Sequence, residues 1–158
     1  MLKKIVSIIV LICVCSGMFG TVAFASSGAC GDNATWSFAD GILTISGTGD
    51  MNVDYNPPWA DIKNQIKKVV IEDGITSISR SAFGWCTNLE SVYFGKGIKK
   101  IGQSAFLMCG KLNTVELPSG ITKIEDDAFS ATGVSGNQDN WTDGVFYIGT
   151  YAISANDS

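Results

Sequence analysis

The feature that most constrains this chain is an internal repeat of period 23, which begins at Val69 and needs no gap. Residues of the same kind recur in eight columns along it. The columns are Val69, Val92, Val115; Ile71, Phe94, Leu117; Gly74, Gly97, Gly120; Ile75, Ile98, Ile121; Ile78, Ile101, Ile124; Ala82-Phe83, Ala105-Phe106, Ala128-Phe129; Cys86, Cys109; and Leu89, Leu112. A unit this small cannot bury its own apolar side chains, so equivalent positions must stack on one another. The repeat therefore predicts a solenoid.

Each unit contains local signals for short, mostly β structure. The alternation of Val69 and Ile71 indicates a short strand, and Gly74 marks a turn where a Cβ atom would be crowded. A second inward segment starts at Ile75, and the stretch 81–83 is expected to form a tight helical or 3₁₀ turn that places Phe83 in the core. Stacking of the units then predicts a core ladder, which consists of Phe83, Phe106 and Phe129 with Cys86 and Cys109.

The pattern V-x-I…G-I-x-x-I…A-F…C…L resembles the BspA-type leucine-rich repeat family, which is found in secreted and surface-attached bacterial proteins. The resemblance covers residues 69 to about 134. The flanking segments 30–33, 43–49 and 58–59 resemble the leader module that often precedes such repeats. The resemblance implies a leucine-rich-repeat solenoid that binds or adheres rather than catalyses. Thr132 stands where a cysteine is expected and no closing leucine follows, so we expect the regular stack to end there.

Residues 1–25 have the layout of a secretory signal peptide. Lys3 and Lys4 precede an apolar run over residues 5–15, and Ala23-Phe24-Ala25 forms an A-x-A cleavage site. The alternative is an uncleaved membrane anchor over residues 5–25. Cleavage after Ala25 leaves residues 26–158, and the loss of the two lysines lowers the formal charge from −4 to −6.

Three further segments follow the signal. Residues 26–68 are expected to form an N-terminal capping module of a β-hairpin and a short helix, in which Trp59, Ile62 and Ile66 share one helical face. The alternative for this module is an aromatic platform for sugar made by Trp36 and Trp59. The repeats occupy residues 69–134, as units 69–91, 92–114 and a partial 115–134. Residues 135–158 are expected to form a loop and a C-terminal hairpin, which either caps the stack or belongs to a truncated piece of a longer protein.

Composition excludes much enzyme chemistry. The chain contains no histidine, which removes His-based acid/base work, Ser-His and Cys-His nucleophile pairs, and the commonest zinc ligand. The acidic cluster over residues 125–127 is expected to be a solvated face. The mature chain keeps Cys30, Cys86 and Cys109, an odd number, and the latter two are either buried thiols or a disulfide between rungs. We predict no catalytic residue, no cofactor and no metal.

The predicted function is binding at a cell surface. Alternate strand side chains point away from the core, and those expected to form a binding surface are Val70, Glu72, Ser91, Tyr93 and Glu116. The expected partner is a protein or a glycan at a cell surface or matrix, with no nucleic acid and, after signal cleavage, no membrane. An open solenoid end permits self-association. The alternative is the targeting or adhesion end of a larger secreted protein that carries a separate enzyme or wall-anchoring module.

Overall fold

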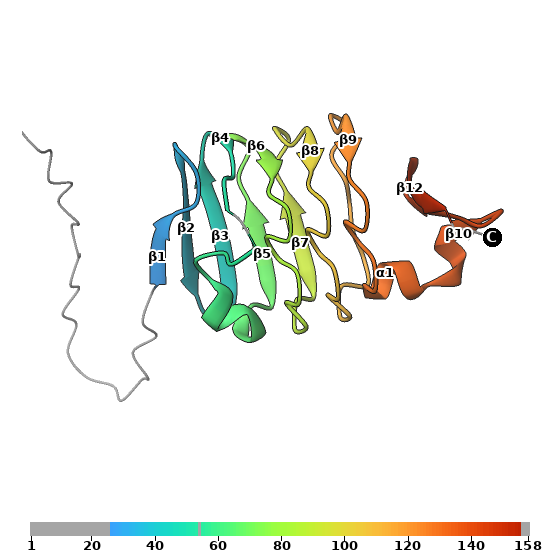
Figure 1. Ribbon diagram of the computed structural model, residues 1–158, viewed down its shortest axis with the longest axis horizontal. Helices are drawn as coiled ribbons and strands as arrows, with labels where there is room; N and C mark the ends of the chain where they lie inside the picture. The colour runs from blue at the N-terminus through green and yellow to red at the C-terminus, as the bar shows by residue number, and fades with distance from the viewer. Residues whose placement is uncertain (1–25, 54, 156–158) are drawn as a thin grey trace, which may run out of the picture.

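The computed structural model describes residues 26–53 and 55–155, so the predicted signal peptide lies outside the described residues. In chain order the elements are β1 (Ser26–Ala29), β2 (Ala34–Ala39), β3 (Ile42–Gly47), β4 (Gly49–Asp50), η1 (Ala60–Gln65), β5 (Lys68–Ile71), β6 (Ile75–Ile78), β7 (Ser91–Phe94), β8 (Lys100–Ile101), β9 (Lys123–Ile124), α1 (Gly133–Gly136), η2 (Gln138–Asn140), β10 (Trp141–Thr142), β11 (Val145–Ile148) and β12 (Tyr151–Ala155). In Figure 1 the strands from β1 to β9 stand side by side along the long axis, and α1 leads from them to β10–β12. No helix in the described ranges is long and apolar enough to cross a membrane.

Two sheets run along the stack. The first has the order β1-β2-β3-β5-β7, and the second has the order β4-β6-β8-β9. In the first sheet Val69 pairs with Val92 and Ile71 with Phe94, and in the second Ile78 pairs with Ile101, all in parallel register. Each pair joins positions one repeat period apart, so each turn of the chain stacks on the one before. The predicted solenoid is confirmed.

The N-terminal hairpin contributes the first rung of the solenoid. Strands β2 and β3 are joined by Asp40 and Gly41, whose φ angles of 52° and 80° form a two-residue turn suited to a hairpin. β3 then pairs in parallel with β5, with Leu43 beside Val69. The separation of these two positions is longer than the repeat period, which places this rung outside the strict repeat. The capping strand and the first repeat strand are therefore neighbours in one continuous sheet.

A column of stacked aromatic rings fills the core. The rings of Phe83, Phe106 and Phe129 lie nearly parallel, with centroids 5.3 and 5.2 Å apart. Trp59 heads the same column, 5.6 Å from the Phe83 ring, and its indole N–H donates to the Ala82 carbonyl at 2.7 Å. Trp36 packs edge-on against Trp59. The alternative of a sugar platform at Trp36 and Trp59 is wrong, because both rings are buried.

The segment that carries each ladder phenylalanine is a series of tight turns rather than a helical turn. Ser81 and Trp85 take left-handed φ angles of 53° and 65° on either side of Phe83. Their N–H groups donate to Gln103 and Leu107 of the next unit, at 2.9 and 2.8 Å. These bonds alternate with turn bonds inside the segment, in which the Ala82, Gly84 and Cys86 N–H groups donate to the carbonyls three residues earlier at 3.1–3.3 Å. The expected amphipathic helix near Trp59 is the short 3₁₀ helix η1.

The stack ends within the third unit. Residues 115–117 form no strand, so the first sheet stops at β7 within the described part of the chain. Pro118, which has no N–H to donate, stands directly after these residues. Thr132 fills the cysteine position, is buried, and caps α1 with its hydroxyl. Beyond α1 the predicted hairpin forms from β11 and β12, and the Tyr151 hydroxyl donates to the Pro118 carbonyl at 3.1 Å.

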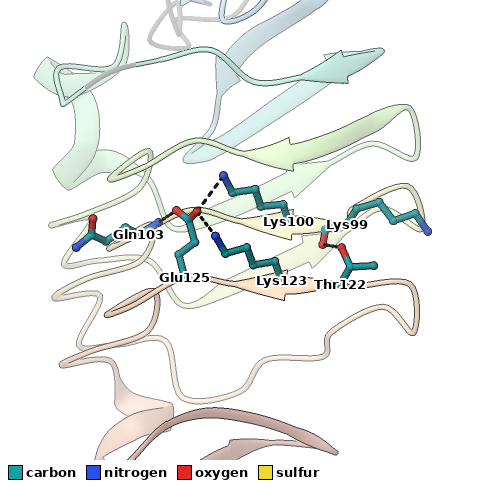
Figure 2. Close-up of polar contacts among 6 residues, drawn as sticks. All are labelled: Lys99, Lys100, Gln103, Thr122, Lys123 and Glu125. Carbon is teal, nitrogen blue, oxygen red and sulfur yellow. Dashed lines mark hydrogen bonds and ion pairs between the residues drawn. The ribbon is translucent and has the colours of Figure 1, made fainter.

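Glu125 ties the second and third units together. Its carboxylate pairs with the ammonium groups of Lys100 at 3.0 Å and Lys123 at 3.1 Å (Figure 2). It also accepts the backbone N–H of Gln103 at 3.0 Å. In the acidic cluster predicted as a solvated face, Asp126 and Asp127 are exposed, and the ion-paired Glu125 side chain is 24% exposed. The hydrogen bonds from Lys100, Lys123 and Gln103 lower the pKa of Glu125 from 4.5 to about 2.

This depressed pKa predicts an acid-sensitive contribution to stability. It is present above pH 4.5, the ordinary pKa, and is lost as the pH falls through about 2. We expect Glu125→Gln to lower the free energy of unfolding at pH 7 by about 1 kcal/mol, the upper range for partly exposed pairs. The difference from wild type should vanish near pH 2, as measured by urea unfolding at each pH. Asp126→Asn, at the exposed next residue, is the control; an equal loss in this variant would contradict the assignment.

Candidate binding surfaces

A row of side chains crosses the outer face of the first sheet. Thr44, Val70 and Tyr93 lie side by side in register on β3, β5 and β7, and we call them the outer row. The Tyr93 side chain is 52% exposed, and Val70 is half-buried. Ile42, 40% exposed, adds a second apolar side chain to this face. The outer face of the first sheet therefore exposes aliphatic and aromatic side chains that are interspersed with polar side chains.

A groove lies beside the outer row where the sheet ends. Segment 114–118 does not pair with β7, and a cavity of about 360 Å³ separates the two. We call this cavity the edge groove; its lining includes Ser91, Tyr93, Lys96, Glu116 and Leu117. A strand edge carries N–H and C=O groups that need partners. The edge groove thus combines an aromatic ring, both signs of charge and unpaired backbone.

The predicted surface residues are distributed over this region. Ser91, Tyr93 and Glu116 line the edge groove, Val70 belongs to the outer row, and Glu72 is exposed just beyond the end of β5. The expectation that Glu116 is a strand residue is wrong. It faces Tyr93 across the groove, because the third strand does not form.

Exposed aromatic residues also occur on a different side, which the predicted binding surface did not include. Trp85 is 52% exposed and Tyr55 is 69% exposed. Both line a cavity of about 220 Å³ between the chain near η1 and the turns of the first two units, which we call the turn cavity. The repeat alignment contained a signal for Trp85: its column holds Trp85, Met108 and Ala131, and such variation between constant columns indicates a surface position.

The three cysteines are buried and free. Burial raises the pKa of the Cys30 thiol to about 11 and those of Cys86 and Cys109 to about 12. The Cys109 thiol donates to the Phe83 carbonyl at 3.2 Å. The alternative of a disulfide between the rungs is therefore wrong. Thiols this far from ionisation are poor nucleophiles at neutral pH.

The described residues bring together no group of three or more Cys, Asp or Glu side chains that could hold a metal ion. The potential nucleophiles are the three buried thiols and surface hydroxyls, and the chain has no histidine to activate either. Two surfaces of the described residues have an exposed aromatic side chain beside a cavity, namely the edge groove with its outer row and the turn cavity. Both are suited to holding a ligand.

Parallel rungs one repeat period apart, inward leucines and phenylalanines, and exposed side chains on the outer sheet define a leucine-rich repeat protein. The family described as the BspA type leucine rich repeat region (6 copies) matches residues 61–157. The chain belongs to this family, which confirms the resemblance noted from the residues.

A solved structure supports the fold. A leucine-rich repeat protein from Eubacterium ventriosum superposes with a TM-score of 0.61 at 28% identity, over 68% of this chain and 30% of that one. The matched part is thus less than a third of that protein. The leucine-rich repeat protein of T. pallidum aligns at 19% identity with a TM-score of 0.36, over 68% of this chain and 64% of that one. A comparison with curated proteins finds no match.

Proposed function

We propose that this protein is a secreted or cell-surface binding module without enzymatic activity, which holds a protein or a glycan of a cell surface or matrix. The observation that carries the proposal is the edge groove with Tyr93 beside it. The core ladder accounts for the inward side chains, but it does not require an exposed tyrosine on the outer row. An exposed aromatic side chain beside a groove is typical of binding surfaces.

Two further observations support the proposal. Membership of the BspA-type family agrees with a secreted or surface-attached protein, and the signal-like segment 1–25 agrees with export. A solenoid exposes an extended sheet whose inner face packs on the stacked core. The outward side chains of this sheet can therefore vary without loss of stability. A rigid surface of this kind loses little conformational entropy on binding.

The test is binding of the purified exported protein to immobilised matrix proteins and to intact cells. We expect Tyr93→Ala to weaken binding about tenfold or more, as for a central aromatic contact. Met108→Ala is the matched control, because Met108 is 37% exposed and lies outside the edge groove. Unchanged binding by Tyr93→Ala, or no binding by the wild type to any of these surfaces, would contradict the proposal.

A further inference from the structure

The turn cavity combines two exposed aromatic rings with polar side chains. Tyr55 and Trp85 form part of its wall, and Asn56, Ser81 and Ser104 add an amide and two hydroxyls. The Arg80 guanidinium lies 4.7 Å from the centroid of the Tyr55 ring, in a cation–π contact that holds the ring in place. The cavity volume of about 220 Å³ is below the roughly 300–1,000 Å³ of sites for drug-sized molecules. The cavity is therefore suited to a single small ring.

The fold does not require a tryptophan at position 85. The same left-handed backbone recurs at Met108 and Ala131, with φ angles of 64° and 54°, so the frame of the repeat imposes this conformation and accepts very different side chains. The tryptophan occurs in the unit that adjoins the segment carrying Tyr55. The Trp85 N–H donates to Leu107 at 2.8 Å, which fixes the backbone that carries the exposed indole. The stacking of the repeats therefore does not account for the exposed indole at position 85.

The described residues that line the turn cavity carry a positive charge, whereas the whole chain is acidic. The sequence has 15 acidic and 11 basic residues, yet the described residues lining the cavity include Lys63 and no carboxylate. The ion pairs of the described residues all involve Glu125 with Lys100 or Lys123, so the Lys63 ammonium is unpaired among them. An unpaired cation in an acidic protein attracts an anionic group.

The backbone of this face is already bonded, which disfavours a peptide. The N–H groups of Ser81, Phe83 and Trp85 donate to the next unit at 2.8–2.9 Å, and the Ala82 carbonyl accepts the Trp59 indole N–H. An extended peptide that adds to a sheet needs a free strand edge, and these bonded turns do not offer one. Recognition must use aromatic faces, hydroxyls and the ammonium, which is how a sugar ring is held: its C–H face stacks on an indole while its hydroxyls form hydrogen bonds.

We propose that the turn cavity binds the terminal residue of an acidic glycan, with the pyranose ring stacked on Trp85 and its carboxylate on Lys63. The inference goes beyond the proposed function, which is carried by the edge groove, and assigns a ligand class to a second site. Sialic acids and uronic acids share this chemistry, an apolar ring face with an attached carboxylate. The lining residues select for the carboxylate through charge and for the ring through stacking.

The test is calorimetric titration of the purified exported protein with sialyllactose, trigalacturonic acid and lactose. We expect at least one acidic sugar to bind and lactose, which lacks the carboxylate, to bind at least about tenfold more weakly. Trp85→Ala should weaken acidic-sugar binding about tenfold or more, and Lys63→Gln should remove the preference over lactose. Met108→Ala, at the equivalent position of the next unit, should bind as wild type. Circular dichroism melts of each variant would verify that the fold is intact.

Three results would overturn the inference: no binding of either acidic sugar, equal binding of lactose, or wild-type affinity in a folded Trp85→Ala variant. Which acidic sugar binds distinguishes a sialic acid from a uronic acid. The experiments distinguish failure of the sugar-binding inference from failure of the proposed function. Matrix or cell binding that depends on Tyr93 and not on Trp85 would leave the proposed function standing and remove only the sugar site.

Discussion

Replacement of Phe106 by alanine is expected to lower the free energy of unfolding by about 3–5 kcal/mol, the range for truncating a buried phenylalanine. Phe106 is fully buried and lies between the Phe83 and Phe129 rings, with Phe94 edge-on at 5.7 Å. Its removal leaves a cavity in the middle of the aromatic column that rigid neighbouring rungs cannot close. Because domains of this size are stable by only about 5–15 kcal/mol, the loss is a large fraction of the total.

Urea unfolding followed by circular dichroism measures this effect. Met108→Ala, two residues further on and exposed, should change the unfolding free energy by less than about 0.5 kcal/mol. A Phe106→Ala variant that unfolded at the same urea concentration as wild type would show that the column does not stabilise the solenoid.

The second large effect is expected from Gly97→Ala. A Cβ atom on Gly97 would overlap the Asp73 carbonyl oxygen of the preceding unit and approach the Ile75 carbonyl oxygen at 2.8 Å. These are backbone atoms of a rung held by its own hydrogen bonds, and the Lys96 N–H bonded to the Asp73 carboxylate at 2.9 Å fixes the two turns against each other. The rungs must separate to admit one methyl group. We expect a loss of about 1–3 kcal/mol, as for an overpacked interior, in the same urea measurement.

Gly120→Ala is the matched control for this substitution. Gly120 occupies the same repeat position one unit later, but a Cβ atom there would first meet the Lys99 ammonium, the end of a flexible side chain that can move away. We expect a change of less than about 0.5 kcal/mol. Equal losses at Gly97 and Gly120 would show that the glycine column reflects backbone conformation rather than contact between rungs.

The binding surfaces were predictable only in part. The alternation of β7 places Tyr93 outward, and this follows from the sequence. The edge groove does not, because it exists only where segment 114–118 fails to pair with β7. Trp85 lies in a left-handed turn that periodicity does not reveal. Trp59 was expected in the cap, but its place at the head of the aromatic column follows only from the stacked structure.

The repeat by itself determined the solenoid, its register and the inward columns, including the ladder of Phe83, Phe106 and Phe129. The repeat determines these features because each interior unit packs against an equivalent unit. The same position therefore needs the same kind of side chain in every unit. Only the tertiary structure decided what happens where that neighbour is missing or different. There β3 serves as a first rung outside the strict period, the first sheet of the described residues stops at β7, and Gly120 faces the flexible Lys99 side chain instead of a rigid backbone. Residues recur with the period because each unit packs against an equivalent unit. At the ends of the stack the packing partner differs, so the repeat pattern cannot predict the structure there.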